Sequence, residues 1–232
     1  MTDITLTSDL VVNHIDSMGF DDRVIQAAQV SAKGENKPET VPPRLIQSLM
    51  KHKHGSTFEH SVFTFYVKAP IFVFREWHRH RISSFNEMSG RYTELLPEFY
   101  IPAEDRKLFN AGTKMKPDFV DAPEEVGKEL GASLSYVASA TWSEYQRLLG
   151  LDIANEVARM VLPLNIMSQM YWTVNARSLM NFLSLRGSQE GATVVSHPQR
   201  EIQIAAEAVE KIFAEKMPLT HEAFVLNGRV AP

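Results

Sequence analysis

The 232-residue chain contains no cysteine. Disulfide bonds, cysteine-ligated zinc and a thiolate nucleophile are therefore excluded. The chain also lacks any apolar run that approaches the roughly 20 residues of a membrane-spanning helix. Its N-terminus shows no basic segment followed by an apolar one, which a secretory signal would have. These absences predict a cytoplasmic protein that does not enter a membrane.

Positive charge is not in excess either. The formal net charge is −4 and the pI about 6.1, whereas a dedicated nucleic-acid binder usually has a basic balance. A local basic pocket remains compatible with this charge. Neither a P-loop, a G-x-G-x-x-G motif nor an internal repeat is visible. The length and the 44% apolar content suit one sizeable fold, so we predict a single domain over residues 1–232.

Periodicity and capping residues predict the secondary structure. Strands are expected over 4–7, 10–12, 61–67 and 168–174, and helices from Asp21 onward and over 44–51, 70–79, 123–149, 153–162, 175–186 and 199–216. Gly150 would end the long helix, and Asp152 and Asn175 would cap the two helices that follow them. We expect a loop over 34–40, and an irregular connection over 93–123 with a short helix near 104–109.

One stretch is unusually polar for its length. Residues 79–92 read RHRISSFNEMSGRY, so three arginines and a histidine lie beside a carboxylate, an amide and several hydroxyls. Arginine presents flat forks of N–H donors that match phosphates and planar oxyanions. Because clustered cations repel one another, we expect an anionic ligand between them. Gly90 would let the backbone approach that ligand closely.

A second polar segment is the histidine-bearing turn KHKHGS at residues 51–56. A solvated surface loop is the plain interpretation. A metal site is the alternative, because imidazoles at short spacing can bind zinc, but no clear carboxylate or cysteine partners complete it. We therefore predict no metal.

The polar stretch resembles the signature of the flavin-dependent thymidylate synthases, R-H-R-x-x-S-x-N-E-x-S-x-R-Y, and matches it at all nine fixed positions. Three further segments are similar to family blocks: H-x-x-x-x-E-H at 54–60, A-R-x-x-L-P at 158–163 and N-A-R-S-L-x-N-F-L-x-L-R at 175–186. The resemblance extends from about His54 to Phe224, which is most of the chain.

The resemblance implies an α+β fold, with a small, mostly antiparallel sheet packed with long helices and a flavin site that is not a Rossmann fold. It also implies a homotetramer whose active sites are shared between chains. The expected reaction is the reductive methylation of dUMP to dTMP, with carbon from 5,10-methylenetetrahydrofolate and electrons from NADPH through bound FAD. Without a cysteine, this chain cannot use the route that attacks uracil with a thiolate.

The resemblance also implies roles for individual residues. Those expected at the flavin are Ser56, Arg79, His80, Arg81, Ile82, Glu87, Asn175, Ala176, Arg177 and Asn181. Those expected at dUMP are Glu76, Trp77, His78, Arg79, Glu87, Met88, Ser89, Gly90, Arg91, Arg159 and Arg186. His54 would lie at the mouth of the active site. Arg79, Arg91 and Arg159 would hold phosphates of the nucleotide or of the flavin.

Arg186 is the expected catalytic residue. Uracil N3 is a weak acid, and a guanidinium beside N3 and the adjacent carbonyl would stabilise the deprotonated ring. That polarises the C5–C6 bond and allows a hydride to add at C6. Ser89 is the rival as a nucleophile, but a serine hydroxyl is weak without a positioned base. We therefore expect Ser89 to bind the nucleotide.

Two features depart from the family pattern. Glu76 stands where the family often has glutamine, and a carboxylate accepts hydrogen bonds but does not donate them unless it is protonated. Residues 187–196 look like an insertion before His197, and they would form either a mobile flap or a surface segment without a role.

Two other classes of protein remain as alternatives. A nucleic-acid-binding module built on residues 79–91 would bind in a strongly salt-dependent way and would need no flavin. A non-catalytic protein that binds a nucleotide or a metal would instead use the five histidines His52, His54, His60, His78 and His80. Metal analysis of the purified protein distinguishes a metal-binding protein from the other classes.

Overall fold

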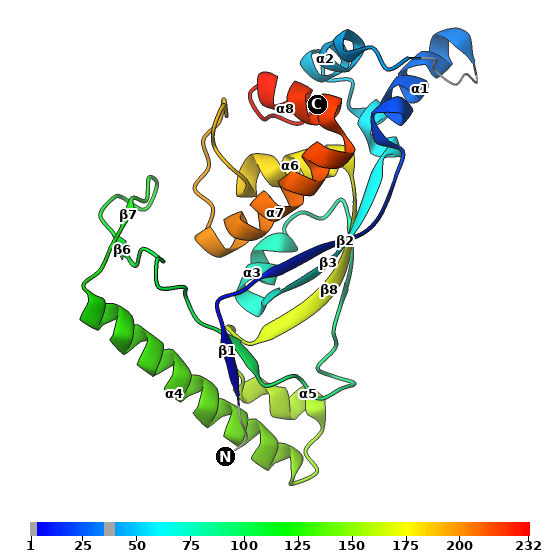
Figure 1. Cartoon of the computed structure of the whole chain (residues 1–232). Helices are drawn as coiled ribbons and strands as arrows, with labels where there is room; N and C mark the ends of the chain where they lie inside the picture. The colour runs from blue at the N-terminus through cyan, green and yellow to red at the C-terminus, as the bar shows by residue number, and fades with distance from the viewer. Residues whose placement is uncertain (1–3, 35–39) are drawn as a thin grey trace. The chain divides into compact units, whose positions relative to one another are not determined.

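The computed structural model describes residues 4–34 and 40–232, so most of the loop predicted at 34–40 lies outside the described residues. The strands are β1 Thr5–Thr7, β2 Val11–Met18, β3 Val62–Pro70, β4 Ser84–Glu87, β5 Glu98–Tyr100, β6 Phe109–Asn110, β7 Phe119–Val120 and β8 Met167–Asn175 (Figure 1). The helices are α1 Phe20–Lys33, α2 Pro43–Lys51, α3 Ile71–Trp77, α4 Glu124–Leu149, α5 Asn155–Ala158, α6 Ala176–Arg186, α7 Arg200–Lys216 and α8 Pro218–Leu226, with 3-10 turns η1 Gly55–His60 and η2 Arg159–Val161.

The chain forms two compact units, and it passes between them several times. Unit 1 comprises the described part of Met1–Leu10 together with Lys68–Arg75 and Glu87–Gln169, and unit 2 comprises the described part of Val11–Val67 together with Glu76–Asn86 and Met170–Pro232. The single domain expected over residues 1–232 stays a prediction.

Unit 2 contains most of a four-stranded sheet with the order β2-β3-β8-β4. Side chains of a strand alternate between the two faces, and β3 follows this rule closely. Phe63, Phe65 and Val67 are fully buried, whereas the residues between them are half-buried. The same alternation in β8 buries Trp172 and Val174. One face of the sheet is therefore apolar and supports the helices.

Aromatic rings join the sheet of unit 2 to its helices. Trp172 on β8 lies 5.5 Å from Phe65 and 5.1 Å from Trp77, measured between ring centroids. Trp77 stacks on Phe182 of α6 at 4.9 Å, and Phe213 of α7 meets Phe63 edge-on at 5.9 Å. Such rings bury a large area each, so they fix the positions of Trp77 and α6 against the sheet.

Beyond the sheet, a buried ionic cluster ties the last helices of unit 2 together. Glu210 on α7 accepts from His221 on α8 at 2.9 Å and from Arg229 at 2.6 Å. Burial opposes ionisation of Glu210, but the hydrogen bonds from His221 and Arg229 outweigh it and lower its pKa to about 2. The start of α8 is held by Asp21, whose carboxylate accepts from the backbone of Leu219 and Thr220.

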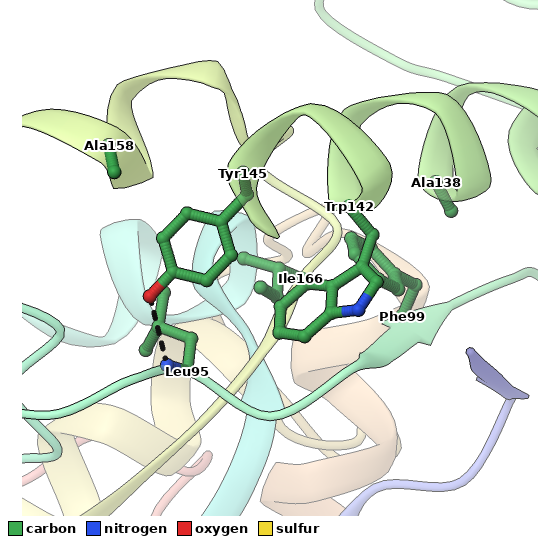
Figure 2. Packing of buried hydrophobic residues seen from close by; sticks show 7 residues of the cluster. All are labelled: Leu95, Phe99, Ala138, Trp142, Tyr145, Ala158 and Ile166. Carbon is green, nitrogen blue, oxygen red and sulfur yellow. Dashed lines mark hydrogen bonds between the residues drawn. The ribbon is translucent and has the colours of Figure 1, made fainter. Parts of the chain in front are cut away.

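Unit 1 is built around the second half of α4. Trp142 and Tyr145 of this helix are buried against Leu95, Phe99 and Ile166, and the Tyr145 hydroxyl accepts from the Leu95 amide at 3.3 Å (Figure 2). Strand β1 pairs in parallel with β5, and β6 pairs antiparallel with β7. The first half of α4 makes little contact: residues 124–129 are all exposed.

The predicted α+β class with small, mostly antiparallel sheets is confirmed, with the β1–β5 pair as the parallel exception. The helix at 123–149 and the Asn175 cap are confirmed as well, since the Asn175 side chain accepts from the Ser178 amide at 2.9 Å. Within the described residues, every helix is too short or too polar to cross a bilayer.

Several local predictions are wrong. The helix expected over 153–162 is only α5 followed by the single turn η2, because Asp152 adopts φ 59° in a tight turn and Ala154 becomes the N-cap. No helix forms near 104–109, where the chain leads into the β6–β7 hairpin. Pro70 ends β3 and the helix starts one residue later. Helix α8 was not predicted.

Candidate active site

The polar stretch begins where α3 gives way to a loop in unit 2. Trp77, the last residue of α3, is fully buried and anchors the loop through its aromatic contacts. The amide of His80 donates to the Trp77 carbonyl at 3.0 Å, and the Ser83 hydroxyl donates to the His80 carbonyl at 2.7 Å. A short loop fixed at both ends holds its side chains in defined positions, which suits a binding site.

Two cavities in unit 2 adjoin this loop. The first, of about 440 Å³, is lined by loop residues and by β8 and α6: Arg79, His80, Arg81, Ile82, Val174, Ser178 and Asn181. The second, of about 640 Å³, shares three of these residues and ends at α6: His78, Arg79, His80, Arg81, Leu185 and Arg186. Both volumes lie in the range of about 300–1,000 Å³ that is common for small-molecule sites.

The arginines at these cavities differ in their partners. Arg79 and Arg81 are exposed and form no ion pair or hydrogen bond with side chains of residues 4–34 and 40–232. Arg186 instead donates from Nη1 to Glu76 Oε2 at 2.6 Å and from Nε to His80 Nε2 at 3.3 Å. The cavities therefore carry two cations that have not been neutralised and a third that is paired.

The imidazole of His80 is kept neutral in this setting. Burial lowers its pKa from 6.5 to about 4, and the positive charge of Arg186 lowers it in the same direction. The ring also meets Phe182 edge-on, with centroids 5.0 Å apart. At neutral pH His80 accordingly adds no charge to the site.

The start of α6 and the η1 turn supply the other residues of unit 2 that we expected at the flavin. Arg177 donates from Nη1 to Glu59 at 2.6 Å and from Nε to the Pro232 carbonyl oxygen at 2.7 Å. Ser56 lies exposed in η1, and Ala176 is fully buried. Of the helix face predicted at 177, 181 and 184, Asn181 is the residue that lines one of these two cavities.

The remaining signature residues belong to unit 1. Glu87 accepts from the hydroxyl of Ser168 at 2.7 Å, and the Met88 amide donates to the Gln169 carbonyl at 2.8 Å. Arg91 pairs with Glu156 at 2.6 Å on the exposed surface. Arg159 is exposed and forms no ion pair with the described residues.

Comparison with known proteins identifies the family. The model of the family described as "Thymidylate synthase complementing protein" matches residues 13–219. The flavin-dependent thymidylate synthase of Streptomyces coelicolor is 48% identical over 236 residues, covering 99% of this chain and 96% of the relative. That of Thermotoga neapolitana is 49% identical over 214 residues, covering 92% and 90%. The chain belongs to the flavin-dependent thymidylate synthase family.

A solved structure agrees with this assignment. The UMP/dUMP methylase PolB from Streptomyces cacaoi, bound with 5-Br UMP, matches with a TM-score of 0.92 and 44% identity over 99% of both chains. The same protein bound with 5-Br dUMP also matches with a TM-score of 0.92. The predicted family and the prediction that this chain is an enzyme are confirmed.

Within unit 2, the structure brings a group of the expected site residues together. The two cavities gather His78, Arg79, His80, Arg81, Ile82, Asn181 and Arg186. Glu76 joins them through Arg186. The side chains of Trp77 and Ala176 are fully buried, so only their backbones are left for a ligand. The roles of all these residues stay predictions.

Two residues of the signature, Gly90 and Ser89, have contacts that bear on their expected roles. Gly90 is buried, and a Cβ on it would lie 3.1 Å from the Leu95 side chain, so packing also favours a small residue here. Its expected role at the ligand stays a prediction. The Ser89 hydroxyl accepts from the Arg91 amide at 3.3 Å, and no carboxylate or imidazole of the described residues contacts it. Ser89 thus lacks the base that a nucleophile needs.

The histidines and the insertion are also placed. No group of three or more potential metal-ligating side chains forms within the described part of the chain. The segment 187–196 is tethered, because Thr193 donates to the Gly228 carbonyl at 2.9 Å and the Ser196 hydroxyl donates to the Leu185 carbonyl at 2.9 Å. His197 is exposed beyond it.

Ser168, Val174 and Ser178 contact the site or its residues but were not predicted. For Ser168 the sequence offers little signal, because Gln169, Thr173 and Asn175 are also polar residues of this strand. In the structure Ser168 is 4% exposed. A buried hydroxyl in such a place usually has a specific hydrogen-bond partner, which here is Glu87.

Proposed function

We propose that this enzyme converts dUMP to dTMP by reductive methylation. The one-carbon unit comes from 5,10-methylenetetrahydrofolate and two electrons come from NADPH, so that tetrahydrofolate and NADP⁺ leave with dTMP. FAD would link the two, because a bound flavin accepts a hydride from one reactant and passes it to another. The name of the S. coelicolor relative and the 5-Br dUMP in the PolB structure support this proposal.

The observation that carries the proposal is the unpaired charge of Arg79 and Arg81 beside a cavity. Exposed, unpaired guanidiniums at a cavity suit an anion, and phosphates match their geometry. Ser178 and Asn181 of the same cavity offer a hydroxyl and an amide, and Ile82 and Val174 offer apolar surface. This set of donors and apolar groups fits a dinucleotide with a planar ring, such as FAD.

In this proposal Arg186 acts on the uracil ring. It borders the second cavity, and its guanidinium is held by Glu76 and His80. Its positive charge would favour the N3-deprotonated ring and would lower the energy of charge that develops there. Ser89 would bind the nucleotide, and no side chain of this cysteine-free chain would attack the ring. In unit 1, Arg91, Arg159 and Glu87 would contact dUMP.

We also propose the homotetramer with shared active sites. The first half of α4 leaves apolar side chains exposed, among them Val126 at 37% and Tyr136 at 75%, and Met115 near the β6–β7 hairpin is 85% exposed. Contacts between copies would cover such surface. Light scattering of the purified protein should give four chains, and a monomeric mass would contradict the shared site.

The test of the function is an absorption spectrum of the purified protein, followed by anaerobic addition of NADPH and then dUMP. We expect flavin bands that bleach with NADPH, and in a separate sample of oxidised enzyme we expect the bands to shift when dUMP is added. A colourless protein that takes up no added FAD would rule out the proposed function. Product analysis with labelled methylenetetrahydrofolate then establishes the carbon donor.

A further inference from the structure

A strap of chain, residues 228–232, lies along α6 in unit 2 and is held near both of its ends. Near its start, the Ser184 hydroxyl donates to the Arg229 carbonyl at 2.6 Å. At residue 232, Arg177 donates from Nε to the main-chain oxygen of Pro232 at 2.7 Å. Arg177 and Ser184 lie two helical turns apart on one face of α6, so the strap spans that face.

Further contacts hold the strap between these two points. Arg229 is 5% exposed, and its guanidinium pairs with Glu210 at 2.6 Å. Lys53, in the turn that follows α2, donates from Nζ to the Ala231 carbonyl at 3.2 Å. Pro232 is buried as well. Because the strap is buried and hydrogen-bonded in this way, it can hold a side chain that binds to it in one orientation.

The strap and one carboxylate set the orientation of Arg177. Its Nε donates to Pro232, and its Nη1 donates to Glu59 at 2.6 Å. Its Nη2 donates to none of the residues that the structure describes. The Arg177 side chain is 43% exposed, so the guanidinium is accessible to a ligand. Arg177 thus presents an oriented donor from the same helix whose Ser178 and Asn181 line the first cavity.

Gly55 makes the contact between Arg177 and the strap possible. A Cβ on Gly55 would lie 2.6 Å from both Cζ and Nε of Arg177, and 2.9 Å from the Pro232 oxygen. Real Cβ atoms essentially never come within 3.0 Å of another heavy atom in this way. Any side chain at residue 55 would therefore displace the guanidinium from the strap. This contact gives the glycine of the KHKHGS turn a structural reason.

We propose that the strap positions Arg177 for the anionic part of FAD. The main-chain oxygen of Pro232 holds Nε, and this restrains a long side chain that would otherwise lose conformational entropy when the ligand binds. A guanidinium fork that is already oriented matches the oxygens of a phosphate. The inference rests on the proposed binding of FAD, and it gives a positioning role to a segment that lies outside all four family motifs.

Two substitutions disturb the strap and leave in place every side chain that we expect at the flavin. Gly55→Ala places a methyl group against Arg177 and the Pro232 oxygen, and it should weaken FAD binding about 10-fold, the equivalent of one hydrogen bond to a charged group. Lys53→Met removes the donor to Ala231 and should weaken FAD binding about threefold, because that contact is exposed.

Two lysine variants complete the set. Lys53→Arg keeps a donor for the strap and should restore the affinity that Lys53→Met loses. Lys51→Met is the matched control, because it removes the same charge from an exposed residue two positions earlier that donates no hydrogen bond to the described residues of the strap. We expect its FAD affinity to equal that of the wild type.

The measurement is a titration of the full-length apoprotein of each variant with FAD, followed by flavin fluorescence. A double-mutant cycle with Arg177→Met then shows whether the strap acts through this arginine. If it does, Gly55→Ala and Lys53→Met should each cost less than about twofold once Arg177 has been replaced. Full-sized effects in that background would overturn the inference. So would unchanged FAD affinity in both strap variants, or an equal loss in Lys51→Met.

A second readout needs no flavin. In apoprotein labelled with ¹⁵N-arginine, the Nε proton of Arg177, assigned from Arg177→Met, should exchange slowly with solvent because Pro232 accepts it. Gly55→Ala should speed this exchange about 10-fold. Fast exchange in the wild type would contradict the strap contact itself. A wild type that binds no FAD would contradict the proposed function, whereas the exchange rate would still decide whether the strap holds Arg177.

Discussion

Unit 2 contains two clusters of one glutamate, one histidine and one arginine, and they differ in which residue is central. In the first, Glu210 is central and accepts from both His221 and Arg229. In the second, Arg186 is central and donates to both Glu76 and His80. The same three types of side chain therefore form two different arrangements. The two differ in how many hydrogen-bond donors remain for a ligand.

The central residue explains the difference. Both oxygens of Glu210 are occupied, and Arg229 is 5% exposed, so that cluster is closed and contributes to stability. Around Arg186 the donors exceed the acceptors, and a cavity of about 640 Å³ adjoins it. The titrating groups also differ: the pKa of Glu210 is lowered to about 2, and that of His80 to about 4. An arginine with donors to spare marks the cluster that can act on a ligand.

The largest expected effect comes from removing the central arginine. Arg186→Ala should leave FAD bound but should lower dTMP formation at least about 100-fold, because no other group supplies its electrostatic stabilisation. Single-turnover assays with bound, reduced flavin measure this directly. Unchanged turnover would remove Arg186 from the chemistry and would make the two clusters equivalent.

Removing Glu210 from the closed cluster should lower the stability of the protein and leave its activity unchanged. Glu210→Ala leaves Arg229 buried without its partner, so we expect a loss of about 3 kcal/mol in the free energy of unfolding. Glu207→Ala, one turn earlier on α7, breaks a more exposed pair with Arg200 and should cost less than about 1 kcal/mol. Urea denaturation of both variants, with kcat measured alongside, distinguishes the two pairs. Equal losses would contradict the assignment of the Glu210 cluster as buried support.

The pH dependence of stability should also separate the clusters. Because the pKa of His80 is lower in the folded protein than in the unfolded chain, the unfolded state takes up its proton first as the pH falls. Stability from this group is complete above about pH 6.5 and is lost toward pH 4, by about 2 kcal/mol after allowance for partial exposure. Glu210 loses its contribution at lower pH, from about 4.5 down to 2.

Variants assign these two pH ranges to the two clusters. His80→Gln should flatten the stability profile between pH 6.5 and 4 and should preserve the loss below 4.5. Glu210→Gln should flatten the profile below pH 4.5 and should preserve the loss of stability between pH 6.5 and 4. Thermal unfolding across this range measures both, and a His80→Gln profile identical to that of the wild type would contradict the neutral, buried imidazole.

The smallest expected effect concerns unit 1. Ser168→Ala removes the hydroxyl that donates to Glu87, and we expect a weakening of dUMP affinity of about fivefold, which corresponds to one hydrogen bond. Ser168→Thr should restore affinity because it keeps the hydroxyl. On the same strand, Thr173→Val removes a hydroxyl that contacts Thr64, and it serves as the control. Equal loss in Ser168→Thr and Ser168→Ala would indicate a packing effect.

Much of the site could be predicted from the sequence because its residues are close together along the chain. The signature at 79–92 placed Arg79, His80 and Arg81, and all three line the cavities. The pattern at 175–186 predicted α6 and its Asn175 cap, which depend on local hydrogen bonds. Ser168 was missed because its importance depends on Glu87, which is distant in the sequence.

The errors in the fold have local causes of a different kind. The helix predicted at 153–162 has suitable apolar residues, but the backbone at Asp152 turns with φ 59° and delays its start to Asn155. The packing of Leu95 beside Gly90 is another such contact, and the expected role of Gly90 at the ligand stays a prediction. Composition and periodicity do not report such contacts.

By itself, the sequence determined the family, the α+β class and the arginine-rich loop, because these depend on residue types and spacings over short stretches. Only the tertiary structure decided which cations are free. Arg186 meets Glu76 across 110 residues and Arg177 meets Glu59 across 118, whereas Arg79 and Arg81 form no ion pair or hydrogen bond with a side chain of the described residues. Ion pairing depends on distance and burial in space, and these arise only when the helices pack against the sheet.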